Sequence, residues 1–244
     1  MSLASNPFAA PLRHQAPVRA DSMTLVWPGR RIMAGAELHD LTAAEHIMGM
    51  PAVARHYWTA ADVRALIEES RHWPRYELLR GELLVTPAPE PRHQLIVGEL
   101  FALVREYVER ERLGVTFTSP ADIELAPESI MQPDVFVVPN DCIPPEPPMR
   151  WSHVRRLLLA AEVLAPSSLR QDRIEKRDHY LAHGVAQYWI VDPDARVFEC
   201  WAPERAGPVL VRDRLAWQPL PGGAPFELDV REFFERRCRL PRLF

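Results

Sequence analysis

The sequence predicts a mixed α/β (α+β) domain in which helices flank a mixed β-sheet. Apolar residues recur at helical spacing over 93–113, which predicts an amphipathic helix. The run Leu157–Leu164 is apolar except at Glu162, which predicts a strand buried on both faces. Helical and extended patterns alternate from Trp58 to the C-terminal region, as expected for a sheet with helices packed against it.

Local signals place the boundaries of the elements. Thr59 can cap a helix, Gly81 lies in a turn between two short strands, and Gly114 stands where a C-terminal helix cap belongs. Ser168 and Gln171 have the spacing of a capping box. The predicted elements are, in chain order, a helix over 60–70, two strands within 76–85, a helix over 93–113, strands at 115–118, 122–125, 135–138 and 157–164, a helix from 168 to before 184, strands at 188–191 and 197–201, a strand near 215–219 and a helix over 229–237.

The composition limits the class of protein. The 244 residues are 47% hydrophobic and 25% charged, enough for a sizeable core, and no apolar run approaches the ~20 residues of a membrane span. The net charge of -4 argues against an indiscriminate nucleic-acid binder. Three scattered cysteines without a CxxC pair exclude a disulfide scaffold, and the first residues do not resemble a signal peptide. We therefore expect a cytoplasmic protein.

Residues 1 to about 55 lack the pattern of the rest of the chain. Pro, Ala and Arg dominate their start, and apolar residues show only weak periodicity. We expect an N-terminal arm over 1–55, poorly ordered or peripheral. Residues 56–244 are expected to form the folded domain, including the C-terminal strand and helix.

Two acidic residues stand next to apolar strands. Glu162 interrupts the run Leu157–Leu164, where an unpaired carboxylate would cost several kcal/mol, so it must be paired, protonated or metal-bound. Asp134 precedes the apolar segment 135–138. The alternatives are structural: Glu162 can pair with a buried arginine or face water at a sheet edge, and Asp134 can be a turn residue.

Charge is unevenly distributed around these two residues. The segment 119–149 contains six acidic and no basic residues, whereas 150–180 contains seven basic and four acidic residues. Acidic ligands for a hard cation beside cations for phosphate are typical of Mg²⁺-dependent phosphodiester chemistry, although a solvated charge run has the same composition.

Lys176 is the only lysine beside 28 arginines. It follows Asp172 by four residues, so it can form a helical ion pair worth ~0.3 kcal/mol. Alternatively, its compact ammonium reaches the two carboxylates and orients an attacking water or the phosphate. Its being the only lysine favours the second interpretation.

Several short motifs occur together in order. They are Tyr76-Glu77-Leu78-x-x-Gly81-Glu82-Leu83, Pro91-Arg92-His93-Gln94, Gln132-Pro133-Asp134-Val135, Glu162-Val163-Leu164-x-Pro166-Ser167-Ser168, Asp172-x-x-x-Lys176-x-x-x-Tyr180 and Gly184-Val185-x-x-Tyr188-Trp189-Ile190-Val191-Asp192. From about Trp58 to Phe234 the chain thereby resembles the Uma family, which is classed with restriction endonucleases in the PD-(D/E)XK nuclease superfamily.

The resemblance implies a restriction-endonuclease-like core, a mixed sheet flanked by helices, with Mg²⁺ or Mn²⁺ at its mouth. It implies a divalent-metal-dependent endonuclease acting on nucleic acid, DNA in the first place, and is compatible with a homodimer. It assigns catalytic roles to Asp134, Glu162, Lys176 and Glu82, metal ligation to Asp134, Glu162 and Glu82, and supporting roles to Gln132, His93, Asp172 and Tyr180. The plain superfamily motif has its lysine two residues after the acid, where this chain has Leu164, so activity depends on Lys176 reaching the site.

Two other functions remain open at this point. The same fold can serve as a non-catalytic nucleic-acid or protein-interaction module, which the negative net charge favours. His179 and His183, four residues apart on one helix face, could instead bind zinc in a hydrolase, although the sequence suggests no third ligand.

Overall fold

The computed structural model describes residues 57–70, 73–166 and 168–239. The arm predicted over residues 1–55 therefore lies outside the described residues. The elements, in chain order, are α1 (Ala60–Glu69), β1 (Arg75–Leu79), β2 (Glu82–Thr86), α2 (Pro91–Arg110), β3 (Gly114–Thr118), β4 (Ser129–Ile130), β5 (Val135–Pro139), two short 3₁₀ turns (Asn140–Cys142 and Trp151–His153), β6 (Leu159–Val163), a π-helix (Gln171–Lys176), α3 (Arg177–Ala182), β7 (Tyr188–Asp192), β8 (Val197–Trp201), β9 (Val209–Val211), β10 (Arg214–Trp217), β11 (Phe226–Asp229), α4 (Val230–Glu232) and a final π-helix (Phe233–Arg237).

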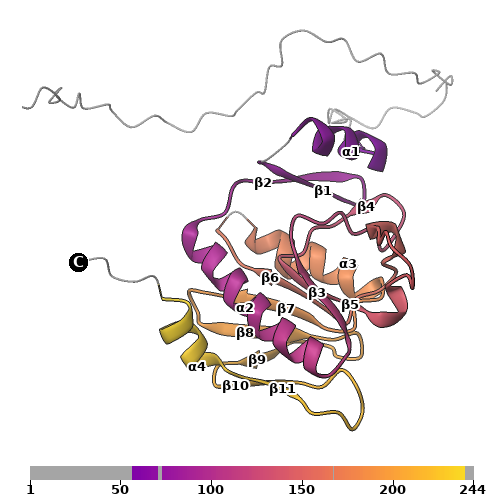
Figure 1. Ribbon diagram of the computed structural model, residues 1–244. Coiled ribbons are helices and arrows are strands. Elements are labelled where there is room, and N and C mark those ends of the chain that lie inside the picture. The colour runs from indigo at the N-terminus through magenta and orange to yellow at the C-terminus, as the bar shows by residue number, and fades with distance from the viewer. Residues whose placement is uncertain (1–56, 71–72, 167, 240–244) are drawn as a thin grey trace, which may run out of the picture. The chain divides into compact units, whose positions relative to one another are not determined.

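A six-stranded mixed sheet forms the centre of the fold (Figure 1). Its strand order is β3-β5-β6-β7-β8-β9, with β6 and β7 parallel and the other neighbours antiparallel. The apolar run predicted as a central strand forms β6, and every residue of β6 is buried. The predicted fold class, a mixed sheet flanked by helices, is confirmed.

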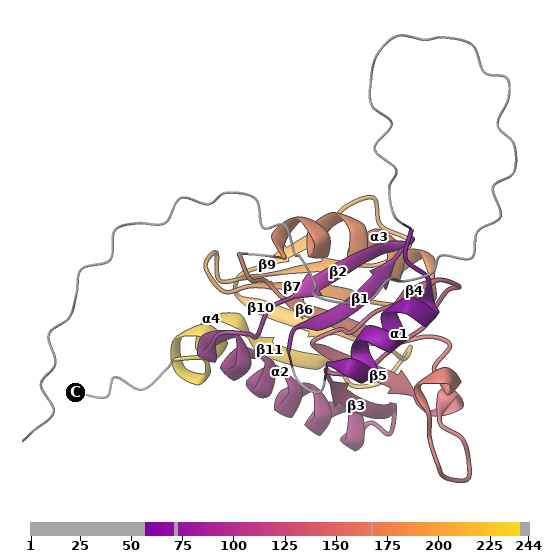
Figure 2. The ribbon, with the colours of Figure 1, turned by 90° about the horizontal axis from the view of Figure 1, so that it is seen from above.

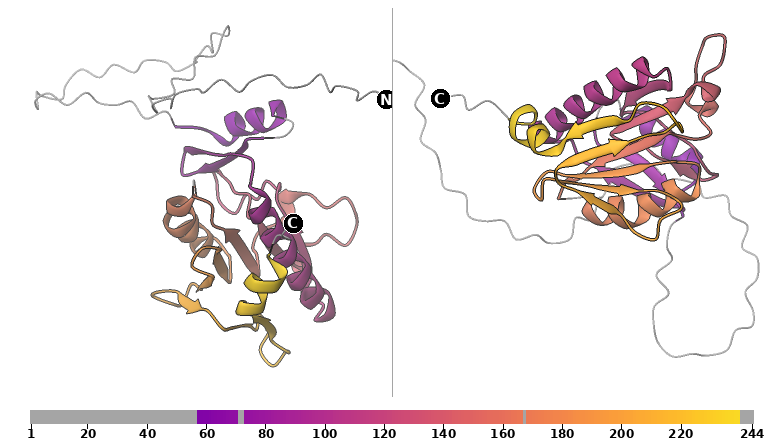
Figure 3. Two further views of the ribbon diagram at one scale, coloured as in Figure 1. Left: turned by 90° about the vertical axis from the view of Figure 1, so that its left-hand side faces the viewer. Right: turned by 90° about the horizontal axis from the view of Figure 1, so that it is seen from below.

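The two faces of the sheet are covered by different helices. Because side chains alternate along a strand, Val135 and Val137 of β5 pack towards α2 and the C-terminal helices, whereas Phe136 and Val138 pack towards α3. Figures 2 and 3 show α2 and α3 on opposite sides of the sheet, with α4 on the same side as α2. Glu162 shares a face with Ala160 of β6, so its side chain points towards the α3 layer.

A smaller sheet with the order β2-β1-β4 lies beside the central sheet. Val63 of α1 packs on Leu78 and Ile130 of this sheet. Thr59 caps α1 as the sequence predicts, and Asp62 completes a capping box with it. Leu79 at the end of β1 belongs to the core on the α3 face, so the small sheet is joined to the central one by apolar contacts.

Some predicted elements differ from the structure. Residues 122–125 do not form a strand, since only Ile123 makes a single bridge, to Met131. Strands β4, β9 and β11 were not expected, and each is short. Gly114 opens β3 rather than capping α2, and a side chain there would collide with the Val138 carbonyl.

The predicted helix after β6 is wound differently from an ordinary α-helix. Residues Gln171–Lys176 form a π-helix that continues directly into α3. Such wider turns occur frequently at functional sites, because they shift which side chains point into the protein. Asp172 and Lys176 lie on this π-helix and are buried.

None of the helices in the described part of the chain is long and apolar enough to cross a membrane.

Candidate active site

Strands β5 and β6 bring Asp134 and Glu162 to the same end of the central sheet. Val135 pairs with Ala161 across the two strands, so the residue before β5 lies beside the residues that follow Ala161. The Asp134 Oδ2 accepts a hydrogen bond from the backbone N–H of Val163 at 3.0 Å, directly after Glu162. Asp134 and Glu162 are only 4% and 2% exposed.

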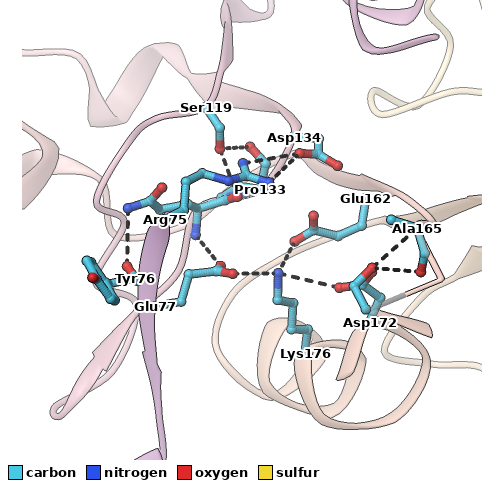
Figure 4. A network of polar contacts seen from close by, with 12 residues as sticks. Arg75, Tyr76, Glu77, Ser119, Pro133, Asp134, Glu162, Ala165, Asp172 and Lys176 are labelled. Carbon is cyan, nitrogen blue, oxygen red and sulfur yellow. Dashed lines mark hydrogen bonds and ion pairs between the residues drawn. The ribbon is translucent and has the colours of Figure 1, made fainter. Parts of the chain in front are cut away.

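Lys176 lies at the centre of three carboxylates (Figure 4). Its Nζ is 2.8 Å from Glu77 Oε2, 3.2 Å from Glu162 Oε1 and 3.4 Å from Asp172 Oδ1. The lysine is 4% exposed. The helical ion pair with Asp172 is thus present, but Asp172 is only one of three buried partners, so the pair does not account for Lys176.

Glu82 does not lie in this cluster, contrary to the prediction, and Glu77 supplies the carboxylate from the early strands. Glu82 is exposed at the start of β2, opposite Leu79. Glu77 is fully buried and pairs with Leu84, two positions farther from the turn. A displacement of two residues moves a side chain about 7 Å along a strand, enough to separate the two glutamates. Glu77 had the same signal as Glu162, a carboxylate within an apolar strand.

The other predicted residues surround the cluster. The backbone N–H of Gln132 donates to Glu77 Oε1 at 2.7 Å, and the Tyr180 hydroxyl donates to Glu162 Oε1 at 3.2 Å. The His93 Nε2 is 3.2 Å from Asp134 Oδ2. Each of these three residues holds one carboxylate in place.

Arg75 is the functional candidate that sequence reasoning missed. Both of its terminal nitrogens donate to Asp134 Oδ1 at 3.2 Å, and its side chain is 10% exposed. Arginine is common in this chain, and Arg75 stands at the start of β1, where a charged residue is not unusual, so no sequence signal distinguished it.

An open cleft reaches the cluster. It has a volume of about 390 Å³, and its lining includes the side chains of the site: Arg75, His93, Asp134, Glu162, Asp172 and Lys176. We call it the carboxylate cleft. Through it a ligand can reach carboxylates that are otherwise buried.

Comparison with known proteins identifies the family of the chain. The profile of the Uma2 family, described as "Putative restriction endonuclease", matches residues 61–231. The chain belongs to the Uma2 family. The predicted resemblance is thereby confirmed, and the match includes every residue of the cluster.

The fold of this Uma2 chain is similar to that of a solved protein. The crystal structure of a "putative nuclease belonging to DUF820" from Anabaena variabilis aligns with a TM-score of 0.57 and 20% sequence identity, over 70% of this chain and 96% of the other. At this identity the likeness shows the fold alone. A comparison with curated proteins finds no match.

The site of the Uma2 chain carries more acidic than basic side chains. Four carboxylates (Glu77, Asp134, Glu162 and Asp172) face two permanent cations, Arg75 and Lys176. Burial, followed by the charges of Asp134, Asp172 and Glu77, raises the pKa of Glu162 well above its usual value despite Lys176. Burial likewise raises the pKa of Asp172. The surplus of negative charge therefore favours binding of protons or of a cation.

Asp134 and Lys176 keep their charges. Burial alone would raise the pKa of Asp134, but His93 and then Arg75 lower it to about 2. Burial opposes the charge of Lys176, yet the three carboxylates outweigh this effect and raise its pKa well above the usual value. Lys176 is thus an ammonium at neutral pH.

The donors fit a hard divalent cation in chemistry and charge. Asp134 and Glu162 offer carboxylate oxygens at the wall of the carboxylate cleft, and Mg²⁺ and Mn²⁺ prefer such ligands. Within the described ranges, however, no three His, Cys, Asp or Glu side chains form a ready-made metal site. Arg75, His93 and Lys176 hold the acidic oxygens instead, so ion binding would require these contacts to rearrange.

The histidine pair proposed as a zinc site gains no further ligand. The rings of His179 and His183 lie 4.5 Å apart, and His179 is buried. Burial, with the charges of His183 and Arg80, lowers the pKa of His179 to about 4, so this ring is neutral at physiological pH. The described residues provide no third metal-binding side chain beside the pair.

Proposed function

We propose that this protein is a divalent-metal-dependent endonuclease that hydrolyses phosphodiester bonds of DNA. The observation that carries the proposal is the buried group of Asp134, Glu162 and Lys176 at the wall of an open cleft, with Glu77 bound to Lys176 behind it. The family description, "Putative restriction endonuclease", supports the reaction class, as does the term nuclease for the similar protein from Anabaena variabilis.

Asp134 and Glu162 would hold Mg²⁺ or Mn²⁺, with Glu77 in the role predicted for Glu82. When bound, the ion supplies a coordinated water of lowered pKa and neutralises charge on the phosphate. Tyr180 and the Gln132 backbone keep Glu162 and Glu77 oriented through their hydrogen bonds. His93 does the same for Asp134.

Lys176 would act as a fixed positive charge. Because its pKa is raised, the ammonium does not take a proton from water, so orientation of the water or stabilisation of the phosphate is the role it can perform. Arg75 would contribute a second charge that contacts the phosphate once a metal ion occupies Asp134.

The location and assembly of the protein remain predictions. The cysteines support a cytoplasmic protein, since all three are free. The homodimer rests on the family resemblance alone.

The proposal is tested by comparing Asp134→Asn with Asp141→Asn. Asp134 and Asp141 lie at opposite ends of β5, and each is paired with an arginine, Arg75 or Arg156. We expect Asp134→Asn to lower Mn²⁺-dependent plasmid nicking at least 10²-fold and to remove Mn²⁺ binding measured by calorimetry. The exposed Asp141→Asn should leave both unchanged.

Addition of EDTA should abolish nicking by the wild type. Circular dichroism establishes that each variant is folded before its activity is compared. Nicking that persists in EDTA, or in a folded Asp134→Asn variant, would contradict the proposed function.

A further inference from the structure

A second cleft adjoins the carboxylate cleft. It also has a volume of about 390 Å³, and we call it the Trp73 cleft because Trp73, Gln94, Val97 and Pro120 line it. Arg75, His93 and Asp134 line both clefts. A ligand bound at Asp134 can therefore extend from one cleft into the other.

Trp73 is a partly exposed aromatic residue. Its side chain is 41% exposed, although burial of an aromatic ring is favourable. The guanidinium of Arg75 lies 5.2 Å from the ring centroid, and the same guanidinium donates to Asp134 at 3.2 Å. One arginine thus joins an exposed aromatic ring directly to a carboxylate of the candidate active site.

Two polar atoms in the shared wall lack partners. Arg75 Nε and His93 Nδ1 are buried and have no hydrogen-bond partner within the described part of the chain. A buried donor without an acceptor is costly, so such a group in a native protein requires an explanation, for example a catalytic role or a bound ion or water. A nucleotide offers phosphate and base oxygens that could accept from Arg75.

The chemistry of the Trp73 cleft matches a nucleobase. Its ring offers a stacking surface, and the exposed Gln94 offers an amide that can hydrogen-bond a base edge. In a duplex the bases are stacked inside the helix, so a base can enter a protein cleft only when it is unpaired. The burial of Asp134 and Glu162 also favours a narrow substrate, because the reacting phosphate must reach the wall of the carboxylate cleft.

We propose that the Trp73 cleft binds the nucleobase next to the reacting phosphate, so that the preferred substrate is a single-stranded or locally unpaired nucleic acid. This inference rests on the proposed function, because it assumes that the phosphate binds at Asp134. It assigns Trp73 the role of a binding residue that stacks on the base, with Arg75 joining it to the phosphate site.

Binding in EDTA tests this inference without cleavage. Fluorescence anisotropy with a labelled 12-nucleotide DNA strand, the RNA of the same sequence and the DNA duplex compares the full-length wild type with Trp73→Ala and Trp73→Phe. We expect a single strand, DNA or RNA, to bind at least tenfold more tightly than the duplex. Trp73→Ala should weaken single-strand binding about tenfold. Trp73→Phe should weaken it less, because phenylalanine still stacks.

Trp201→Phe is the matched control. Trp201 also has an arginine over its ring, Arg177 at 4.5 Å, but it lines neither cleft. Its substitution should leave single-strand affinity unchanged. A single abasic nucleotide moved along the strand should weaken wild-type binding at one position and have no such effect in Trp73→Ala.

Tighter binding of the duplex, or equal single-strand affinity in the wild type and the Trp73 variants, would overturn the inference. If circular dichroism shows that Trp73→Ala is unfolded, Trp73→Phe and the abasic series in the wild type test the inference instead. If the protein binds single strands through Trp73 but never nicks DNA, the result contradicts the proposed function and leaves the binding inference standing.

Discussion

Replacing Lys176 with methionine should lower the free energy of unfolding by about 3–5 kcal/mol at neutral pH and abolish cleavage. Methionine has a similar length, but it leaves Glu77, Glu162 and Asp172 buried without their shared cation. Breaking a buried ion pair by removing one partner typically costs this much. Urea denaturation of the wild type and the variant measures the difference.

The loss of stability should depend on pH with a definite sign. Glu162 and Asp172 already have raised pKa values, and without Lys176 these values rise further because the cation no longer opposes protonation. Once protonated, the carboxylates no longer require a cation. The difference between wild type and Lys176→Met should therefore be smaller at pH 5 than at pH 8. A difference that does not vary with pH would contradict this explanation.

Lys176→Arg is the matched variant that retains the charge. The guanidinium is larger than the ammonium and has to fit among carboxylates that lie 2.8 to 3.4 Å from Nζ, so we expect a modest cost of about 1–3 kcal/mol from overpacking. Cleavage should still fall at least 10²-fold, because the guanidinium does not place its charge where the ammonium does. Wild-type cleavage by Lys176→Arg would remove Lys176 from the proposed mechanism.

Glu162→Gln should separate the two effects, with cleavage lost and stability retained. Glutamine keeps the shape of glutamate and can still accept hydrogen bonds from Lys176 and Tyr180. It also removes one of the four crowded carboxylates. At pH values above 7 we expect the free energy of unfolding to equal or exceed that of the wild type. Plasmid nicking in Mn²⁺ should fall at least 10²-fold.

The pH dependence of stability distinguishes the charge of Glu162 from its packing. The pKa of Glu162 is higher in the folded protein than in the unfolded chain, so its contribution to stability is greatest at low pH and is lost as the pH rises through the folded value. This part of the pH dependence should be absent in Glu162→Gln. Identical profiles for the two proteins would contradict the assignment.

Glu199→Gln is the matched control for Glu162→Gln. Both glutamates pair with Ile190 of β7, Glu162 from β6 and Glu199 from β8, so they lie in one row across the sheet. Glu199 is bound by Arg173 and does not line the carboxylate cleft. Its substitution should cost about 1 kcal/mol of stability and leave cleavage unchanged. Equal losses of cleavage in both variants would show that Glu162 acts through the sheet and not on the substrate.

Much of the site could be predicted because buried charge is conspicuous in a sequence. Glu162 within an apolar run and the single Lys176 identified two members directly, and both are buried in the structure. Glu77 carried the same signal within Tyr76–Leu79, but the motif directed attention to Glu82. The difference depends on the place of each residue in the hairpin, since Glu77 lies on β1 between β2 and β4, whereas Glu82 begins the edge strand β2 beside the turn.

Arg75 and Trp73 could not be predicted in the same way. Arginine and tryptophan occur throughout this chain, and neither residue interrupts a pattern. Arg75 became a candidate through its contact with Asp134, 59 residues farther along the chain, and Trp73 through its contact with Arg75 and the cleft that it lines together with Asp134. Contacts over such sequence distances follow from packing and have no local signature.

The sequence by itself determined the alternation of helices and strands, the buried β6, the family of the chain and the residue types of its site. Local periodicity and the cost of burying charge are sufficient for the elements, for β6 and for the residue types, whereas the family follows from the resemblance of several short motifs in order. Only the tertiary structure decided that Lys176 contacts three carboxylates, that Glu77 takes the place expected for Glu82, and that Trp73 lines a cleft continuous with Asp134. These depend on strand register and on a π-helix after β6, which are set by the packing of distant segments against each other.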